Sequence, residues 1–263
     1  MSTAPPPARS AGSPGGPPAA AQPLQRWLAQ TRFETATILR HGEQLLVALV
    51  LPALALVVLA RTDVPDLGPG DRVDLATAGV FALAVVSTAF TGQAIATGFD
   101  RRHGVLRLLG ATPLGRGGLL LGKLGAVGIV LVVQLLVLGA VAALLGWRPP
   151  LSGLLPGAVT VVLGAAAFLS LAMVLAGTVR AEAVLALANL AWVLLLGLGI
   201  LVPTDRLPGA AAAVARVLPS GALGDGMRAA LVAGDWPLGP WLVLMAWAVV
   251  GGLAAARWFR WSD

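Results

Sequence analysis

Basic and apolar side chains gather in one stretch of the chain, GFDRRHGVLRLLGATPLGRGGLLLGK, which runs from Gly98 to Lys123. Val105, Leu108, Leu109 and Thr112 recur there at spacings of three and four residues, which places them on one helical face that Pro113 would end. The stretch also holds Leu106 and five basic residues: Arg101, Arg102, Arg107, Arg116 and Lys123. These residues are suited to binding rather than to catalysis. A helix with an apolar face and basic flanks can dock into a groove of a protein partner or anchor to anionic headgroups. The residues alone leave both hypotheses open.

The segment GGLLLGK, from Gly117 to Lys123, has the Gly and Lys spacing of a phosphate-binding loop. Leu124 stands where that motif needs Ser or Thr for magnesium, and the segment opens a long apolar run instead of following a β-strand. We therefore reject a nucleotide site and expect Lys123 to extend to the lipid headgroups. No stretch could form a nucleotide-binding domain, so any ATP is bound by another chain.

Composition places the chain in a membrane. Of its residues 57% are hydrophobic and 11% are charged, against roughly a quarter charged in a soluble domain. There is no Cys, and the two histidines lie far apart, which argues against metal or triad chemistry. Basic residues form small groups between apolar runs without stacking aromatics, so no nucleic acid is expected as a partner. The bias toward Arg, Ala, Gly, Leu and Val is typical of a GC-rich bacterial genome.

Apolar runs of about 20 residues predict six transmembrane helices. Before them, the Pro- and Gly-rich residues 1–23 predict a disordered tail. Residues 24–41 predict an amphipathic helix, which lies at the membrane interface or packs as a cytoplasmic helix on a partner. Between the last two spans, the broken segment 203–239 predicts two short extracytoplasmic helices, about 209–218 and 221–233, with Ser220 capping the second. The predicted spans are 44–60, 75–99, 118–146, 154–178, 182–202 and 240–257.

Basic residues also orient the spans. If both termini are cytoplasmic, the inner loops and termini hold twice as many of them as the outer loops do. The outer ones are interleaved with aspartates, so the positive-inside rule favours this topology and places the Gly98–Lys123 stretch in the cytoplasm. We expect Arg180 to anchor the fifth span and Glu182 to cap it.

A few polar side chains lie within the spans. Thr91 and Gln93 in the second, Gln134 in the third and Asn189 in the fifth either line a translocation route or bond neighbouring helices. No Asp, Glu or Lys stands near the middle of a span, which argues against an ion-coupled carrier and against intramembrane acid–base catalysis. No GxSxG or HExxH motif is present.

The sequence AFTGQAIATGFDRRHGVLRLLGATPLGRGGLLLGKLGAV resembles the region between the second and third spans of permeases of ABC type-2 exporters of the daunorubicin-resistance class. Segments around Pro52, around Asp225 and Arg228, and at the C-terminal ARWFRW resemble the same family. The matching positions of the first segment are Asp100, Arg101, Arg102, Gly104, Leu106, Leu109, Ala111, Thr112, Pro113, Leu114, Gly122 and Lys123.

This resemblance implies an all-α integral membrane protein whose helix between spans two and three is a cytoplasmic coupling helix. That helix would dock on a separate ABC ATPase, which binds ATP and Mg, through Arg101, Arg102, Val105, Leu106, Leu108, Leu109 and Pro113. The N-terminal helix would help to form the same contact.

A dimer of permeases, identical or related, would export a hydrophobic drug, antibiotic or lipid-like molecule across the bacterial cytoplasmic membrane. The chain itself would carry no cofactor and be no enzyme, and lipids would surround it. A charge at Leu109 would abolish assembly with the ATPase. The alternatives are an ATP-independent secondary carrier and a membrane scaffold that recruits a cytoplasmic partner.

Overall fold

The computed structural model describes residues 23–40, 42–110 and 115–260, so nearly all of the expected tail, as well as Pro113, lies outside the described residues. Every regular element in the described ranges is helical, which confirms the all-α class. In chain order these elements are α1 (Pro23–Arg40), α2 (Gly42–Arg61), α3 (Arg72–Val85), η1 (Val86–Gly92), α4 (Gln93–Arg102), α5 (Val105–Gly110), α6 (Gly115–Leu144), α7 (Leu151–Thr178), α8 (Ala181–Leu195), η2 (Leu196–Ile200), η3 (Thr204–Arg206), α9 (Gly209–Val217), α10 (Pro219–Arg228), η4 (Ala229–Ala233) and α11 (Leu238–Trp258).

Five helical stretches of the described chain are long and apolar enough to cross a membrane. They coincide with the second to sixth predicted spans. For the first predicted span the structure gives α2, with Pro52 inside it, and its apolar part Ala48–Arg61 is shorter than the others. The number six therefore stays a prediction. The five stretches are Arg72–Arg102, Gly118–Leu144, Leu151–Thr178, Ala181–Ile200 and Leu238–Trp258.

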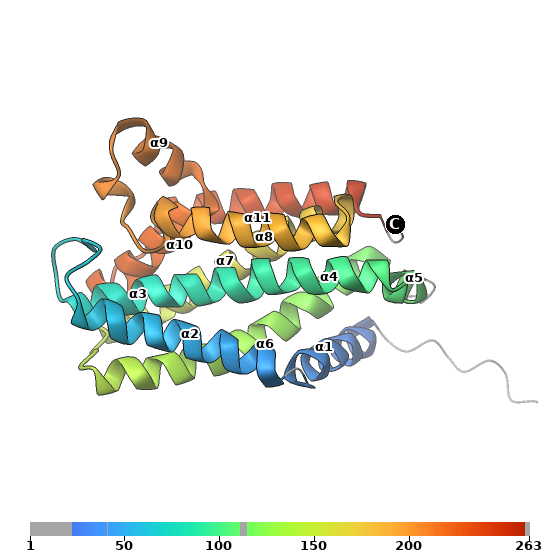
Figure 1. Ribbon diagram of the computed structural model, residues 1–263, viewed down its shortest axis with the longest axis horizontal. Coiled ribbons are helices and arrows are strands. Elements are labelled where there is room, and N and C mark those ends of the chain that lie inside the picture. Colours follow the sequence, from blue (N-terminus) through green and yellow to red (C-terminus); the bar gives the residue numbers. More distant parts are fainter. Residues whose placement is uncertain (1–22, 41, 111–114, 261–263) are drawn as a thin grey trace, which may run out of the picture.

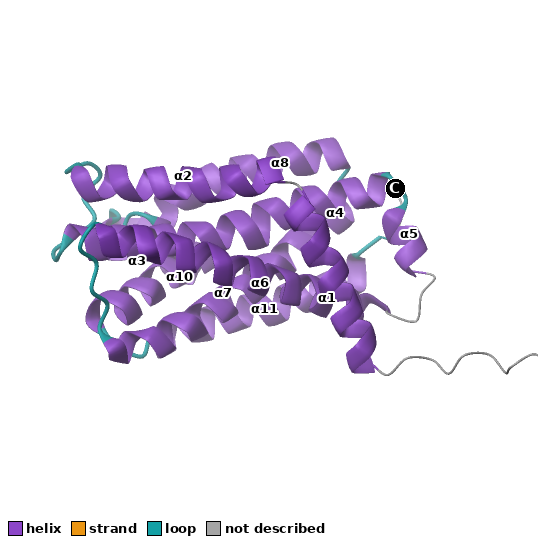
Figure 2. Cartoon of the chain, turned by 90° about the horizontal axis from the view of Figure 1, so that it is seen from below, coloured by secondary structure: helices purple, strands orange, loops and turns teal. Residues whose placement is uncertain are grey.

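The long helices run side by side along one axis, and the short helices lie at the two ends (Figures 1 and 2). At one end lie α1, α5 and the C-terminal end of α11 (Figure 1). At the other end are the connection between α2 and α3, helix α9 and the connection between α6 and α7 (Figure 1). The short helices before the last span are therefore at the opposite end from α5, as the sequence predicts.

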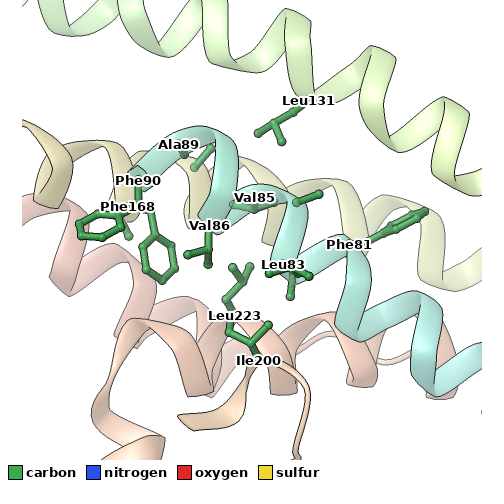
Figure 3. Close-up of a cluster of buried hydrophobic side chains, with 14 of the residues drawn as sticks. Phe81, Leu83, Val85, Val86, Ala89, Phe90, Leu131, Phe168, Ile200 and Leu223 are labelled. Carbon is green, nitrogen blue, oxygen red and sulfur yellow. The ribbon is translucent and has the colours of Figure 1, made fainter. Parts of the chain in front are cut away.

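The continuous helix formed by α3, η1 and α4 is the centre of the bundle. Its apolar side chains Val85, Val86 and Phe90 are buried against α6, α7 and the α10 region (Figure 3). Phe90 packs edge to face on Phe168 of α7, with ring centroids 6.2 Å apart. Because protein rather than lipid surrounds this helix, it can carry Ser, Thr and Gln at depths where lipid-facing helices are apolar.

The cap predicted for the second short helix is wrong. Helix α10 begins at Pro219, with Leu218 in the N-cap position. Proline fits the first helical turn because its ring fixes a helical φ and its missing N–H would have no partner there. Ser220 lies one residue inside the helix, where its side chain is buried and its hydroxyl has no partner among the described residues.

Candidate functional site

The helix expected to couple to a partner, α5, is joined to α4 by a turn of two residues. His103 ends α4, and Gly104 follows with a φ of +76°, a left-handed conformation that glycine adopts without strain. The Gly104 amide donates to the Arg101 carbonyl at 3.1 Å. This short turn ties α5 closely to the central helix.

Arg101 and Arg102 both contact the turn between α7 and α8. Arg101 is only 4% exposed, and its guanidinium donates to the Val179 carbonyl. The neighbouring Arg102 pairs with Glu182 in the first turn of α8. Arg180, the expected anchor, is the exposed N-cap residue of that helix. The two arginines that the sequence assigns to a partner therefore bind within the chain, to a segment about 80 residues away.

The apolar residues of α5 divide between the bundle and the surface. Leu106 is fully buried in the core, Val105 is half-buried, and Leu108 is 73% exposed. The side chain of Leu109 lies outside the described residues. Leu108 is thus the described residue of α5 whose apolar side chain is available to another molecule.

A buried polar cluster lies beside this end of the bundle, between α1, α4 and α6. The Lys123 ammonium is 3.0 Å from a carboxylate oxygen of Glu34 and 3.9 Å from one of Asp100. Gln30 donates to the other oxygen of Glu34 at 2.9 Å. Lys123 is 1% exposed, so the expectation that it extends to the headgroups is wrong. A lysine enclosed in this way needs a charged partner, and Glu34 of α1 supplies it.

Helix α1 packs closely on α6 because two glycines of α6 face it. A Cβ built at Gly122 would lie 2.4 Å from Cγ of Gln30, and one at Gly125 would lie 2.7 Å from Oγ1 of Thr31. The Trp27 indole N–H donates to the Leu121 carbonyl at 2.9 Å. The N-terminal helix α1 is therefore packed directly on α6 and hydrogen-bonded to it.

Replacing Gly125 with leucine is expected to push α1 away from α6 and to lower the free energy of unfolding by about 1–3 kcal/mol. The added side chain would overlap Thr31, which belongs to a packed helix. Chemical unfolding followed by tryptophan fluorescence would measure the change. Gly128→Leu is the matched control, because a Cβ at Gly128 meets nothing within 4 Å. Equal stability of the two variants would contradict the close packing of α1.

The polar residues predicted to line a translocation route occupy different environments. Gln134 accepts a hydrogen bond from Thr88 at 2.8 Å and donates to the Ala48 carbonyl at 2.7 Å, joining α6 to η1 and α2. Buried oxygens of Thr91 and Gln93 have no partner among the described residues. Asn189 is exposed and donates to the Leu185 carbonyl of its own helix at 2.9 Å. The structure thus joins Gln134 to its neighbours and places Asn189 on an outer face of α8.

The opposite end holds a second polar cluster that the sequence did not predict. The helix of α8 and η2 breaks at Leu198 and at Gly199, where φ is +97°. Arg228 donates to the Gly199 carbonyl at 2.7 Å and to the Ile200 carbonyl at 3.0 Å. It also binds Asp225 at 2.9 Å, and the same carboxylate accepts a hydrogen bond from the Thr204 hydroxyl. Burial lowers the pKa of the Arg228 guanidinium, and its hydrogen bond and proximity to Asp225 oppose this shift.

Arg228 supplies hydrogen-bond donors to the backbone carbonyls at a break in a candidate span. The carbonyls freed by the break would otherwise lack donors, and the forked guanidinium satisfies two of them at once. Glycines permit the close approach, because a Cβ at Gly224 would lie 1.9 Å from the Gly199 carbonyl oxygen. The signal was present in the sequence as Asp225 and Arg228 at a spacing of three, a favourable distance for an ion pair on a helix.

No group of three or more His, Cys, Asp and Glu side chains that could hold a metal ion occurs in the part of the chain that the structure describes. The long apolar helices, which run side by side, are those of a multi-span membrane protein. The family model described as an ABC-2 family transporter protein matches residues 67–257. The chain therefore belongs to the ABC-2 transporter family. No curated protein matches it.

Family membership establishes the coarse function. The chain is a membrane subunit of an ABC-2 family transporter and has no catalytic activity of its own. Subunits of this kind generally pair with an ABC ATPase and carry no cofactor, so ATP binding would lie on a partner.

Proposed function

We propose that this chain is the permease of an ATP-driven exporter of the daunorubicin-resistance class and that α5 transmits the movement of a separate ATPase. The observation that carries this proposal is the exposed Leu108 on a helix whose base is fixed in the bundle by Leu106. Helices α1 and α5 and the C-terminal end of α11 lie at the same end (Figure 1), so a cytoplasmic partner would meet all three.

Arg101 and Arg102 give a route by which force on α5 would reach the spans. They are the last two residues of α4, directly before the α4–α5 turn. Arg101 donates to the Val179 carbonyl and Arg102 pairs with Glu182, both at the α7–α8 turn. A displacement of α5 would therefore move the ends of α7 and α8 together with the central helix. In this proposal the two arginines are positioning residues and not part of the contact with the ATPase.

The finer features of the proposed transporter are predictions from the sequence. Six spans would have both termini in the cytoplasm of a bacterium, with α2 as the first, and the positive-inside bias supports this orientation. Two permeases, identical or related, would assemble with two ATPases that bind ATP and Mg. The apolar spans favour a hydrophobic drug, antibiotic or lipid-like substrate, with Thr91, Gln93, Gln134 and Asn189 as candidate contacts.

Replacing Leu108 with aspartate is expected to weaken binding of the ATPase by about thirtyfold, the effect of losing a central apolar contact in an interface. The measurement is purification from native membranes in mild detergent, with the co-purifying ATPase identified by mass spectrometry. Val217→Asp is the matched control, because Val217 is 62% exposed at the other end of the bundle. Leu109→Asp tests the residue of the same helix at which the sequence predicts that a charge abolishes assembly.

Wild-type protein that brings no ATPase with it, under conditions that preserve other complexes, would favour a secondary carrier or a scaffold. An ATPase that remains bound to both α5 variants would show that the contact lies elsewhere at this end of the bundle.

A further inference from the structure

An apolar groove follows the outside of the bundle between α6 and α7. It consists of a cavity of about 500 Å³ and a second of about 330 Å³. The two are continuous, because both are lined by Val132, Leu135, Ala158 and Val161. Nearly all of the atoms exposed in them are apolar. In a membrane such a groove is filled by something apolar, since water gains nothing there.

The larger cavity lies toward the end of the bundle at which α6 and α7 are connected. Trp147 of this connection lines it and packs edge to face on Phe81 of α3, with ring centroids 5.5 Å apart. Along α6 the cavity extends from Val132 to Ala140, about 12 Å at the rise of an α-helix. This length is close to the hydrocarbon depth of a single leaflet, roughly half of 30 Å.

An exposed cation follows the cavity-lining Trp147 in the chain. Arg148 directly follows Trp147, is exposed, and has no carboxylate within 4 Å and no side-chain hydrogen bond among the described residues. Two other arginines at this end do have partners: Arg72 donates to the Leu59 carbonyl and Arg206 pairs with Asp66. Tryptophans concentrate at the level of lipid headgroups, so the connection that holds Trp147 and Arg148 is expected at that level.

We propose that the groove binds an anionic phospholipid of the adjacent leaflet, with an acyl chain between α6 and α7 and the phosphate on Arg148. The exposed Arg148 and an apolar groove about as long as one leaflet is deep match the single charge and the acyl chain of an anionic lipid. Guanidinium and phosphate form paired hydrogen bonds, which gives the site its preference for an anionic headgroup.

The test uses full-length protein in nanodiscs with equal amounts of phosphatidylglycerol and phosphatidylcholine, followed by native mass spectrometry of lipids that remain bound. Wild-type chain is expected to retain phosphatidylglycerol. Ala158→Trp, which fills the groove from its exposed wall, should lower this occupancy by about tenfold. Ala246→Trp on the exposed face of α11 is the matched control and should retain the lipid.

Arg148→Gln should keep lipid in the groove but reduce the preference for phosphatidylglycerol about fivefold, the contribution expected of one basic residue near a membrane surface. Arg216→Gln, another exposed arginine at this end, should leave the preference unchanged. Undiminished occupancy in Ala158→Trp, or an unchanged preference in Arg148→Gln, would overturn the proposal. Loss of self-association in Ala158→Trp with lipid still bound would identify the groove as a subunit contact instead. None of these measurements depends on an ATPase.

Discussion

Replacing Lys123 with methionine is expected to lower the free energy of unfolding by about 3–5 kcal/mol, the typical cost of breaking a buried ion pair from one side. Methionine has a similar size and fits the same space, so the loss comes from charge. Glu34 would remain at the α1–α6 contact with only Gln30 as a hydrogen-bond donor among the described residues. Unfolding of detergent-solubilised protein by sodium dodecyl sulfate, followed through its eight tryptophans, would measure the change.

A double variant separates the effect of charge from that of packing. Glu34→Gln combined with Lys123→Met removes both buried charges and keeps an acceptor for the Gln30 amide, so it should recover most of the lost stability. Asp100 is about one-third exposed and can stay hydrated without Lys123. If the double variant is as unstable as Lys123→Met alone, or if Lys123→Met unfolds like wild type, the buried ion pair does not stabilise the attachment of α1.

Helix positions were predictable because lipid imposes length and apolarity on each span. The spans predicted at 118–146 and 154–178 agree within a few residues with the apolar stretches Gly118–Leu144 and Leu151–Thr178. Helix ends were predicted less well. The central helix extends to Arg102, and Thr97, Gly98 and Arg101 near its end are buried by protein rather than by lipid. Hydropathy cannot report burial by another helix.

The contacts of the site were not predictable, because they join residues far apart in the chain. Lys123 and Glu34 are separated by 89 positions, and Arg102 and Glu182 by 80. The sequence around each basic residue predicts only a headgroup anchor or a contact with a partner protein. One local signal did exist: Gly122 and Gly125, three residues apart on either side of Lys123, leave a helix face without side chains that a second helix can approach closely. That spacing indicated that Lys123 lies at a helix contact.

Replacing Arg228 with methionine is expected to destabilise the other end of the bundle by about 3 kcal/mol or more. The carbonyls of Gly199 and Ile200 would lose their donors, and Asp225 would lose its charged partner. Each buried polar group left unsatisfied costs about 1–3 kcal/mol. Hydrogen exchange of the amides from Leu198 to Thr204 would show faster opening of the break in the fifth span, and the midpoint of unfolding would fall with it.

Two further variants identify the cause of this loss. Arg228→Lys keeps the charge but not the fork that reaches two carbonyls at once, so its stability should lie between those of wild type and Arg228→Met. Arg216→Met, on the exposed side of α9, should change stability by less than about 0.5 kcal/mol. If Arg228→Lys matched wild type, the charge alone would account for the effect. If Arg228→Met matched wild type, the break at Gly199 would be held by the close glycine contacts of α10, and Gly224→Ala would then be the more damaging change.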